Sequence, residues 1–368
     1  MSSVKIKRGQ FVINGKRRPY LTMTSFCLMG LYQNKRRADA QRWLDRLQRM
    51  GIDGPRLFGE TWPLSPDNEF FGNPKWTPEA RIIDDNQPPT SALRLLPRYE
   101  RYVELLTRDL EDRGMIAEFC VVATKKDWPG TGHILNRAAQ MFHQMFGEGD
   151  CPYIFETINE ADAYVYPELT PGEVAAMGYR WHRIGGLNEP DHTNFPGSLI
   201  GVSAGGDWTP KWDDSGYTHR NLHPPRGKHW MMGPTGKPIA QELDALKRAA
   251  GNRPLAFNET CHYIDQKEWK DMMTLSHSKW AALSTSDWRG LIEYQEAVTA
   301  AGVSFCYHTR VGMSTDPSEP LTKLEEALAS RAGVSPEPPL PPPEPPDVTG
   351  DSPSGFWAAV WSILKRLF

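Results

Sequence analysis

Residues 4–334 carry two alternating patterns: short apolar runs, and longer stretches with an apolar residue every three or four positions. The short runs are typical of buried β-strands and the longer stretches of amphipathic helices. Nearly every predicted strand is followed by a predicted helix, which favours a closed parallel barrel over an open sheet. The predicted fold class is therefore α/β, a (β/α)8 TIM barrel. Its eight strands are predicted at residues 19–26, 54–58, 115–123, within 152–162, 198–206, 219–225, 254–260 and 303–309.

The helix after the first strand illustrates the pattern. In residues 36–50 the side chains at helical spacing are Ala38, Trp43, Leu44 and Leu47, and Gly51 is placed to end the helix. The next helix is expected to begin near Pro97. Later helices are predicted at residues 133–147, 170–186, 239–251, 290–302 and 321–330.

Two segments depart from the strand–helix repeat. Residues 4–16 predict an N-terminal β-hairpin that turns at Arg8-Gly9. Residues 207–218, DWTPKWDDSGYT, show no helical period and are predicted to form a long functional loop between strands five and six.

The composition changes abruptly after Val334. Residues 335–355 are rich in proline and predict a polyproline-type linker, and residues 356–368 place most of their apolar side chains on one helical arc. A helix of this length is too short to cross a bilayer, which takes about 20 residues. We expect a docking helix that binds a larger protein assembly, such as a virus-like particle, or a membrane surface. Packing against its own barrel is the alternative. The predicted organisation is a barrel at 1–334, a linker at 335–355 and a docking helix at 356–368.

Composition excludes several classes of function. The net charge of −3 and the pI near 6.4 give no electrostatic case for nucleic-acid binding. Five cysteines without a CxxC spacing indicate neither a disulfide framework nor a zinc site, so we expect reduced thiols. No metal or nucleotide signature is present, and no metal or cofactor is predicted. The N-terminal residues lack the apolar run of a secretory signal, so synthesis in a cytoplasm is expected, with particle association or release by lysis left open.

Two predicted strands end on the same pair of residue types. Strand four ends in Asn159-Glu160 and strand seven in Asn258-Glu259. Because the carboxyl ends of barrel strands surround one mouth, the two carboxylates are expected to face each other across it. Glycoside hydrolysis needs such a pair, one group to protonate the leaving oxygen and one to attack or to activate water.

Residues 4–334 resemble clan A of the glycoside hydrolases, the retaining (β/α)8 enzymes that include cellulases, β-mannanases and β-galactosidases. The stretches that carry the resemblance are FVINGKRRPYLTM, GPRLF, INEA and FNET. The resemblance implies that Glu160 is the acid/base, that Glu259 is the nucleophile and that Asn159 binds the sugar 2-hydroxyl. It also implies that Arg56 hydrogen-bonds the nucleophile, keeping it ionised, and that His223 lies near it.

Three positions depart from the clan's pattern. Ala161 replaces the proline that commonly follows the strand-four glutamate, strand three ends without a histidine, and strand eight ends CYHT instead of in tryptophan. Glu156 shares its strand facing with Glu160 and could tune it, or could be a barrel-interior carboxylate paired with an arginine. Glu118 leaves the same two interpretations open.

Aromatic residues follow several strand ends. Their faces could stack on sugar rings, although any one of them could instead pack its own loop. The predicted function is a retaining glycosidase acting on a β-linked polysaccharide or oligosaccharide, with a carboxyl separation of ~5–5.5 Å. The alternative is a carbohydrate-binding barrel without catalysis. Neither the sugar nor an endo or exo mode follows from the sequence. The aromatic candidates are Trp62, Trp128, Trp208, Trp212 and Tyr263.

Overall fold

The computed structural model divides the chain into two compact units, of which the first comprises Met1–Pro317 and Leu321–Pro336. The predicted linker and docking helix at 335–368 lie outside the described residues, so their boundaries stay predictions. The residues that the structure describes are 2–59, 98–122, 131–147, 150–159, 161, 170–186, 194–195, 199–203, 208, 212–224, 231–251, 253–260, 287–308 and 317–333.

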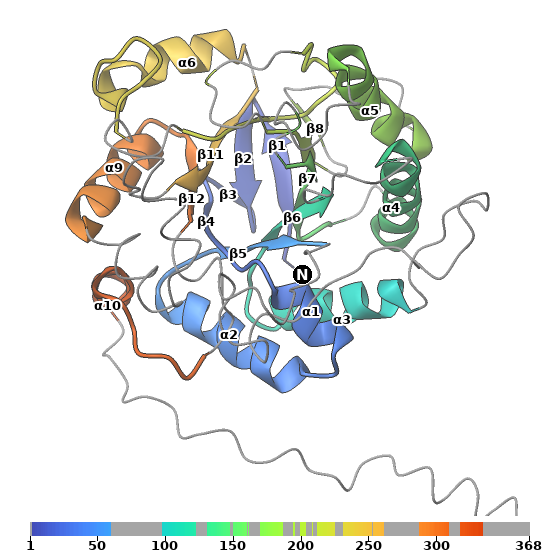
Figure 1. The fold of residues 1–368 in the computed structure, drawn as a ribbon, viewed down its shortest axis with the longest axis horizontal. Helices are drawn as coiled ribbons and strands as arrows, with labels where there is room; N and C mark the ends of the chain where they lie inside the picture. The colour runs from blue at the N-terminus through green and yellow to red at the C-terminus, as the bar shows by residue number, and fades with distance from the viewer. Residues whose placement is uncertain are drawn as a thin grey trace, which may run out of the picture. The chain divides into compact units, whose positions relative to one another are not determined.

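Eight parallel strands form one sheet in the order β10-β11-β12-β4-β5-β6-β7-β9 (Figure 1). Its two edge strands also approach each other, because the backbone N–H of Thr218 donates to Ile200 O at 2.9 Å, just before β10 begins. The sheet is therefore a nearly closed barrel, and the predicted fold class is confirmed. The strands are β4 (Leu21–Thr24), β5 (Gly54–Phe58), β6 (Ala117–Val122), β7 (Tyr153–Ile158), β9 (Leu199–Gly201), β10 (Arg220–Leu222), β11 (Leu255–Thr260) and β12 (Ser304–Tyr307).

A ring of helices surrounds the barrel (Figure 1). In α2 the predicted core residues Trp43, Leu44 and Leu47 are buried, and Gly51, two residues after the helix, takes a φ of +71°. Ala38 is exposed, and Ala40 is buried in its place. The short helix α1 was not predicted. The apolar faces of α3, α5, α9 and α10 are likewise buried in the main hydrophobic core. The helices are α1 (Leu28–Gln33), α2 (Arg37–Arg49), α3 (Tyr99–Glu111), α4 (Thr131–Phe146), α5 (Pro171–Ile184), η2 (Ile239–Gln241), α6 (Leu243–Ala249), α9 (Trp288–Ala300) and α10 (Lys323–Arg331).

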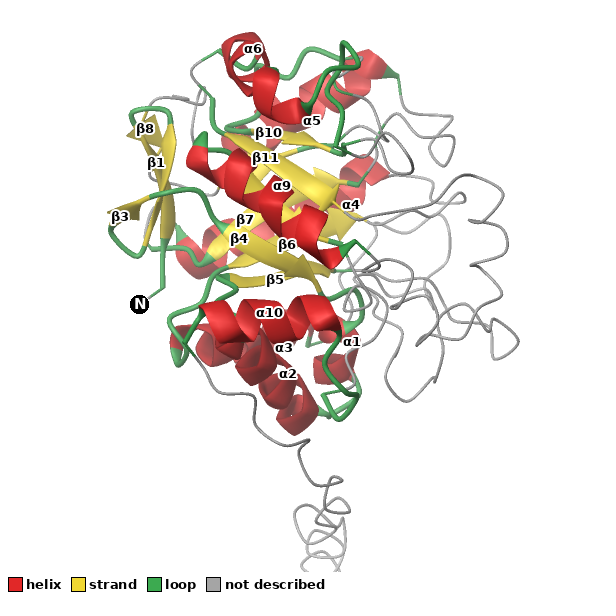
Figure 2. Cartoon of the chain, turned by 90° about the vertical axis from the view of Figure 1, so that its left-hand side faces the viewer, coloured by secondary structure: helices red, strands yellow, loops and turns green. Residues whose placement is uncertain are grey.

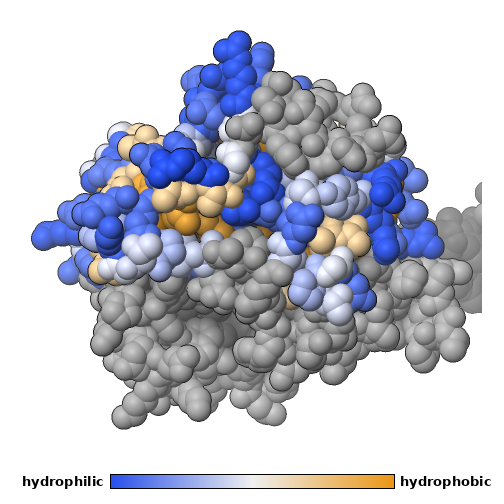
Figure 3. All heavy atoms as spheres, turned by 90° about the horizontal axis from the view of Figure 1, so that it is seen from above, coloured by the Kyte–Doolittle hydropathy of each residue, from blue (hydrophilic) through white to orange (hydrophobic). Residues whose placement is uncertain are grey.

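Figure 3 shows one face on which hydrophilic side chains predominate and apolar ones are exposed only in limited areas. The described cysteines are all free and buried, namely Cys27, Cys120, Cys151 and Cys306, whereas Cys261 lies outside the described residues.

The N-terminal hairpin covers the end of the barrel where the strands begin. It belongs to an antiparallel sheet in the order β3-β2-β1-β8, and Figure 2 shows this sheet beside the barrel. The backbone N–H of Val4 donates to Cys151 O at 3.0 Å, just before β7, and Asn14 Nδ2 donates to Gly114 O at 2.8 Å, just before β6. The predicted turn at Arg8-Gly9 is present. The strands are β1 (Val4–Lys7), β2 (Gln10–Ile13), β3 (Lys16–Arg17) and β8 (Asn194–Phe195).

The hairpin seals an apolar cluster inside the barrel. Its inner face and the first inward residues of several barrel strands form one buried group, so the floor of the barrel is apolar. Two residues further along, the strands carry charges instead: Arg56, Glu118 and Glu156 are all 0 % exposed. Barrel interiors are usually filled by branched apolar side chains, so this charged layer marks where chemistry is to be sought. The floor cluster consists of Val4, Ile6, Phe11, Ile13, Tyr20, Ile116, Ile154, Leu199 and Ala256.

Candidate active site

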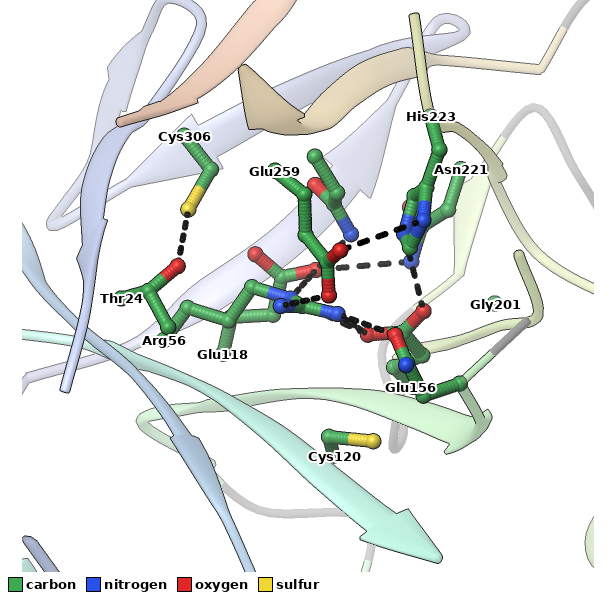
Figure 4. Close-up of polar contacts among 12 residues, drawn as sticks. Thr24, Arg56, Glu118, Cys120, Glu156, Gly201, Asn221, His223, Glu259 and Cys306 are labelled. Atoms are coloured by element: carbon green, nitrogen blue, oxygen red, sulfur yellow. Dashed lines mark hydrogen bonds and ion pairs between the residues drawn. The ribbon is translucent and has the colours of Figure 1, made fainter. Parts of the chain in front are cut away.

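A fully buried arginine from β5 joins the ends of three strands (Figure 4). Arg56 Nη1 donates to Glu259 Oε1 at 2.9 Å, which is the contact predicted between this arginine and the strand-seven glutamate. Its Nη2 donates to Glu156 Oε2 at 2.6 Å and to Asn159 Oδ1 at 2.8 Å, and its Nε donates to Glu156 Oε2 at 3.1 Å. One guanidinium thus fixes two carboxylates and one amide at the mouth.

Glu259 reaches the interior through an irregularity in β11. Phe257 pairs with Phe305, but Thr260 pairs with Tyr307, so three steps on β11 match two on β12. Glu259 itself has a φ of +55°, a left-handed conformation that costs a non-glycine residue about 1–2 kcal/mol.

The consequence of this bulge is a change in facing. In a regular strand, neighbouring side chains point to opposite faces. Here Asn258 donates to Glu118 inside the barrel at 2.5 Å, and the next residue, Glu259, also points inward to Arg56. The bulge therefore delivers both polar residues to the interior.

His223, directly after β10, lies between the same two carboxylates. Its Nδ1 is 3.6 Å from Glu259 Oε2, and its Nε2 is 3.7 Å from Glu156 Oε1. Arg56 and His223 thus each contact Glu156 and Glu259, and the four side chains form a closed ring (Figure 4). We call these four residues the charge ring.

The charge ring keeps Glu156 and Arg56 ionised. Burial alone would raise the pKa of Glu156, but the positive charge of Arg56 and the contact with His223 outweigh burial and lower it. Burial likewise opposes the charge of Arg56, yet the carboxylates around it raise the pKa of this guanidinium well above its usual value. An arginine in this setting stays a cation.

Glu118 has a different character from Glu156. Its carboxylate accepts from Asn258 and, at 3.4 Å, from Asn221, while Arg56 Nε lies 3.9 Å away. Burial raises the pKa of Glu118 to about 7, with the charge of Arg56 opposing and that of Glu156 adding to the effect. Glu118 is therefore largely protonated in mildly acidic solution, and it lies outside the charge ring.

Of the two interpretations left open for Glu156, the structure has the interior carboxylate paired with an arginine.

The predicted acid/base Glu160 lies outside the described residues, as do Trp62, Trp128 and Tyr263. The backbone on both sides of Glu160 is tied to neighbouring strands. The N–H of Asn159 donates to Val122 O at 3.1 Å, and that of Ala161 to Ser203 O at 2.9 Å.

The prediction that Trp212 stacks on a sugar ring is wrong for the free chain. Its side chain is 7 % exposed and belongs to the main hydrophobic core, so the loop-packing alternative holds. Trp208 is partly buried, and its ring packs edge-on against Phe257 with centroids 5.5 Å apart. The loop at 207–218 shows no helix or strand among its described residues, as its sequence predicted.

A histidine that sequence reasoning did not select also lies at the mouth. His308 follows β12, is 6 % exposed, and its Nδ1 is 3.1 Å from Thr24 Oγ1. Its backbone N–H donates to Thr260 O at 2.8 Å, next to Glu259. The signal available in the sequence was its place at the end of strand eight, in the CYHT departure from the clan's tryptophan.

Metal and membrane features are absent from the part of the chain that the structure describes. No group of three or more His, Cys, Asp or Glu side chains there could hold a metal ion. Across the same residues, no helix has both the length and the apolar character needed to span a bilayer.

Comparison with known proteins identifies relatives by fold only. No protein-family model matches the chain, and no curated protein matches it. Among solved structures, a protein from Bacteroides vulgatus ATCC 8482 assigned as a glycoside hydrolase superposes with a TM-score of 0.54 at 10% identity. That match covers 89% of this chain and 60% of the other.

Two further structures have known activities in their names. A β-1,4-D-mannanase from Cryptopygus antarcticus has a TM-score of 0.50 at 9% identity, covering 87% of this chain and 95% of the other. An exo-β-1,4-mannosidase from Opitutaceae bacterium strain TAV5 has a TM-score of 0.50 at 13% identity, covering 89% of this chain and 61% of the other. The chain has the (β/α)8 fold of these glycoside hydrolases. The predicted resemblance is confirmed at the level of fold.

Proposed function

We propose that the chain is a retaining glycoside hydrolase that cleaves a β-linked glycan by double displacement. The observation that carries the proposal is the contact between Arg56 and Glu259 at 2.9 Å, made inside the barrel by a residue with left-handed backbone. A carboxylate kept ionised and aimed by such a contact is suited to nucleophilic attack.

The proposed reaction uses two carboxylates in turn. Glu160 donates its proton to the glycosidic oxygen while Glu259 attacks the anomeric carbon, so the glycosidic C–O bond breaks as the glycosyl ester forms. Glu160 then takes a proton from water, which attacks the same carbon and releases Glu259 as a carboxylate. Asn159, whose Oδ1 accepts from Arg56, would present its Nδ2 to the sugar 2-hydroxyl.

The substrate class is proposed from the same chemistry and from the fold relatives. The two relatives described above by activity are named as a β-1,4-D-mannanase and an exo-β-1,4-mannosidase. We therefore place β-1,4-mannan and manno-oligosaccharides first in a panel that also contains β-1,4-glucans. Trp208, whose side chain is only partly buried, is proposed as a sugar-stacking residue together with Trp62, Trp128 and Tyr263.

Chemical rescue tests the roles of the two glutamates. With an activated aryl β-glycoside and azide, Glu259→Ala should yield the α-glycosyl azide, because azide occupies the space of the nucleophile. Glu160→Ala should yield the β-glycosyl azide, because azide attacks the glycosyl-enzyme from the side of the missing base. Hydrolysis by Glu259→Ala at the parental rate would overturn the assignment.

A carbohydrate-binding barrel without catalysis is the competing function. The departures at Ala161 and at the end of strand three favour it. It predicts binding to a glycan panel with no hydrolysis by the parent protein and no azide product from either variant.

The C-terminal segment is proposed as a tether. Residues 356–368 would bind a protein assembly, such as a virus-like particle, or a membrane surface, with 335–355 as the spacer. Truncation after Val334 should leave hydrolysis intact and abolish assembly or liposome binding. A truncated barrel that unfolds, or a full-length protein that binds neither, would contradict the tether.

A further inference from the structure

We propose that Glu156 is a positioning residue that supplies the permanent counter-charge for Arg56 while Glu259 alternates between carboxylate and ester. The inference rests on the proposed function. It starts from the shared contacts of the charge ring, in which Arg56 hydrogen-bonds to Glu156 and to Glu259 at the same time.

A double displacement changes the charge next to Arg56. When Glu259 Oε bonds to the anomeric carbon, the glycosidic C–O bond breaks and its electron pair leaves with the protonated oxygen. The nucleophile then carries no charge. Arg56 is 0 % exposed, so without another anion it would be a buried cation with no counter-ion, which is strongly unfavourable.

Glu156 is placed to prevent that state. It accepts two hydrogen bonds from Arg56, is itself 0 % exposed, and comes from β7, whereas the nucleophile comes from β11. The charge of Arg56 keeps Glu156 ionised by lowering the pKa of its carboxyl, against the effect of burial. Its second oxygen lies 3.7 Å from His223, so the ring stays connected through β10 when the ester forms.

The inference makes opposite predictions for the two chemical steps. In Glu156→Gln, the carboxylate of Glu259 is the one in the charge ring that still pairs with Arg56. Ester formation removes the charge of Glu259, so formation of the glycosyl-enzyme should slow. Breakdown should accelerate, because it restores that carboxylate. A purely structural role for Glu156 would not speed either step.

The experiment uses 2-deoxy-2-fluoro-β-glycosides with a dinitrophenolate leaving group, in the manno and gluco series, on the full chain. Labelling by Glu156→Gln should be slower than in the parent by about tenfold or more, a change of about 1.4 kcal/mol or more in the barrier. Reactivation of the purified labelled protein, counted per labelled molecule by mass spectrometry, should be several-fold faster.

Glu118→Gln is the matched control. Glu118 is also a fully buried barrel carboxylate, but its closest approach to Arg56 is 3.9 Å. At pH 6 it is mostly protonated, and the amide is a close mimic of that form. Its labelling and reactivation rates should both stay near those of the parent.

Glu156→Asp keeps the test open if the glutamine variant does not fold. The shorter carboxylate lies further from Arg56, so labelling should again be slower and reactivation again faster than in the parent, each by a smaller factor than in Glu156→Gln. A parent that takes no label from any probe would overturn the proposed function, and the inference with it. A parent that is labelled, with both rates lowered together in the Glu156 variants, would overturn the inference alone.

Discussion

Replacing Arg56 by methionine tests whether one cation sustains the charged layer of the barrel. Methionine keeps most of the apolar stem but removes all four hydrogen bonds to Glu156, Glu259 and Asn159. Both carboxylates are nearly or fully buried, at 5 % exposed for Glu259 and 0 % for Glu156. Removing one partner of a buried ion pair typically costs ~3–5 kcal/mol, so unfolding should become more favourable by a factor of about 10²–10⁴ at pH 7.

The pH dependence of this loss follows from Glu156. In the parent protein its folded-state pKa is lowered, so the stability it contributes is present above the unfolded-state pKa and is lost as the pH falls through the folded value. In the variant the charge of Arg56 is gone while burial remains, and burial raises the pKa. In the variant, the carboxyl of Glu156 therefore contributes stability at pH values below its unfolded-state pKa. This contribution is lost as the pH rises through its folded-state pKa. The difference between parent and variant should therefore be larger at pH 7 than at pH 5.

Urea denaturation of both proteins at pH 5, 6 and 7 measures the difference. Arg18→Met is the matched control, because Arg18 also makes a two-pronged contact with a carboxylate, Asp53, but its side chain is 39% exposed. That partly solvated pair should contribute about 1 kcal/mol or less. Equal losses in the two variants, or a loss for Arg56→Met that does not change with pH, would refute the reasoning.

Two further predictions concern other parts of the site. Glu259→Gly should be more resistant to urea than Glu259→Ala by about 1 kcal/mol, because glycine adopts the φ of +55° without a Cβ clash; equal midpoints would contradict a stored backbone cost. Burial raises the pKa of Glu118 to about 7, above its unfolded value, so the stability it contributes below the unfolded pKa is lost as the pH rises through 7. Glu118→Gln should flatten the fall in stability between about pH 5 and 7, and a parental slope in the variant would exclude Glu118 as its source.

Much of the barrel was predictable because its signals are local. Each strand is a short apolar run, and each helix carries its own 3.6-residue period, as Trp43 and Leu47 do in α2. The contact between Arg56 and Glu259 was also predicted, but only through the resemblance to clan A glycoside hydrolases.

The parts that were not predicted depend on tertiary structure. The left-handed backbone of Glu259 has no local signal, because neither a glycine nor an asparagine occupies that position, and only pairing with β12 reveals the extra residue. Trp212 was misjudged for a related reason. A loop tryptophan packs inward or outward according to the apolar surface beneath it, and that surface is assembled from distant segments.

The charge ring also explains why the barrel is polarised along its axis. On β7 the inward side chain changes from Ile154 to Glu156 within two residues, and on β6 from Ile116 to Glu118. Charges and a left-handed residue are unfavourable for folding, and they collect at the end where the strands finish. The apolar floor and the hairpin that seals it supply burial at the other end, away from the charge ring. The apolar floor can therefore stabilise the fold while the charge ring keeps its buried charges, because a change in the floor need not alter the distances between Arg56, Glu156 and Glu259.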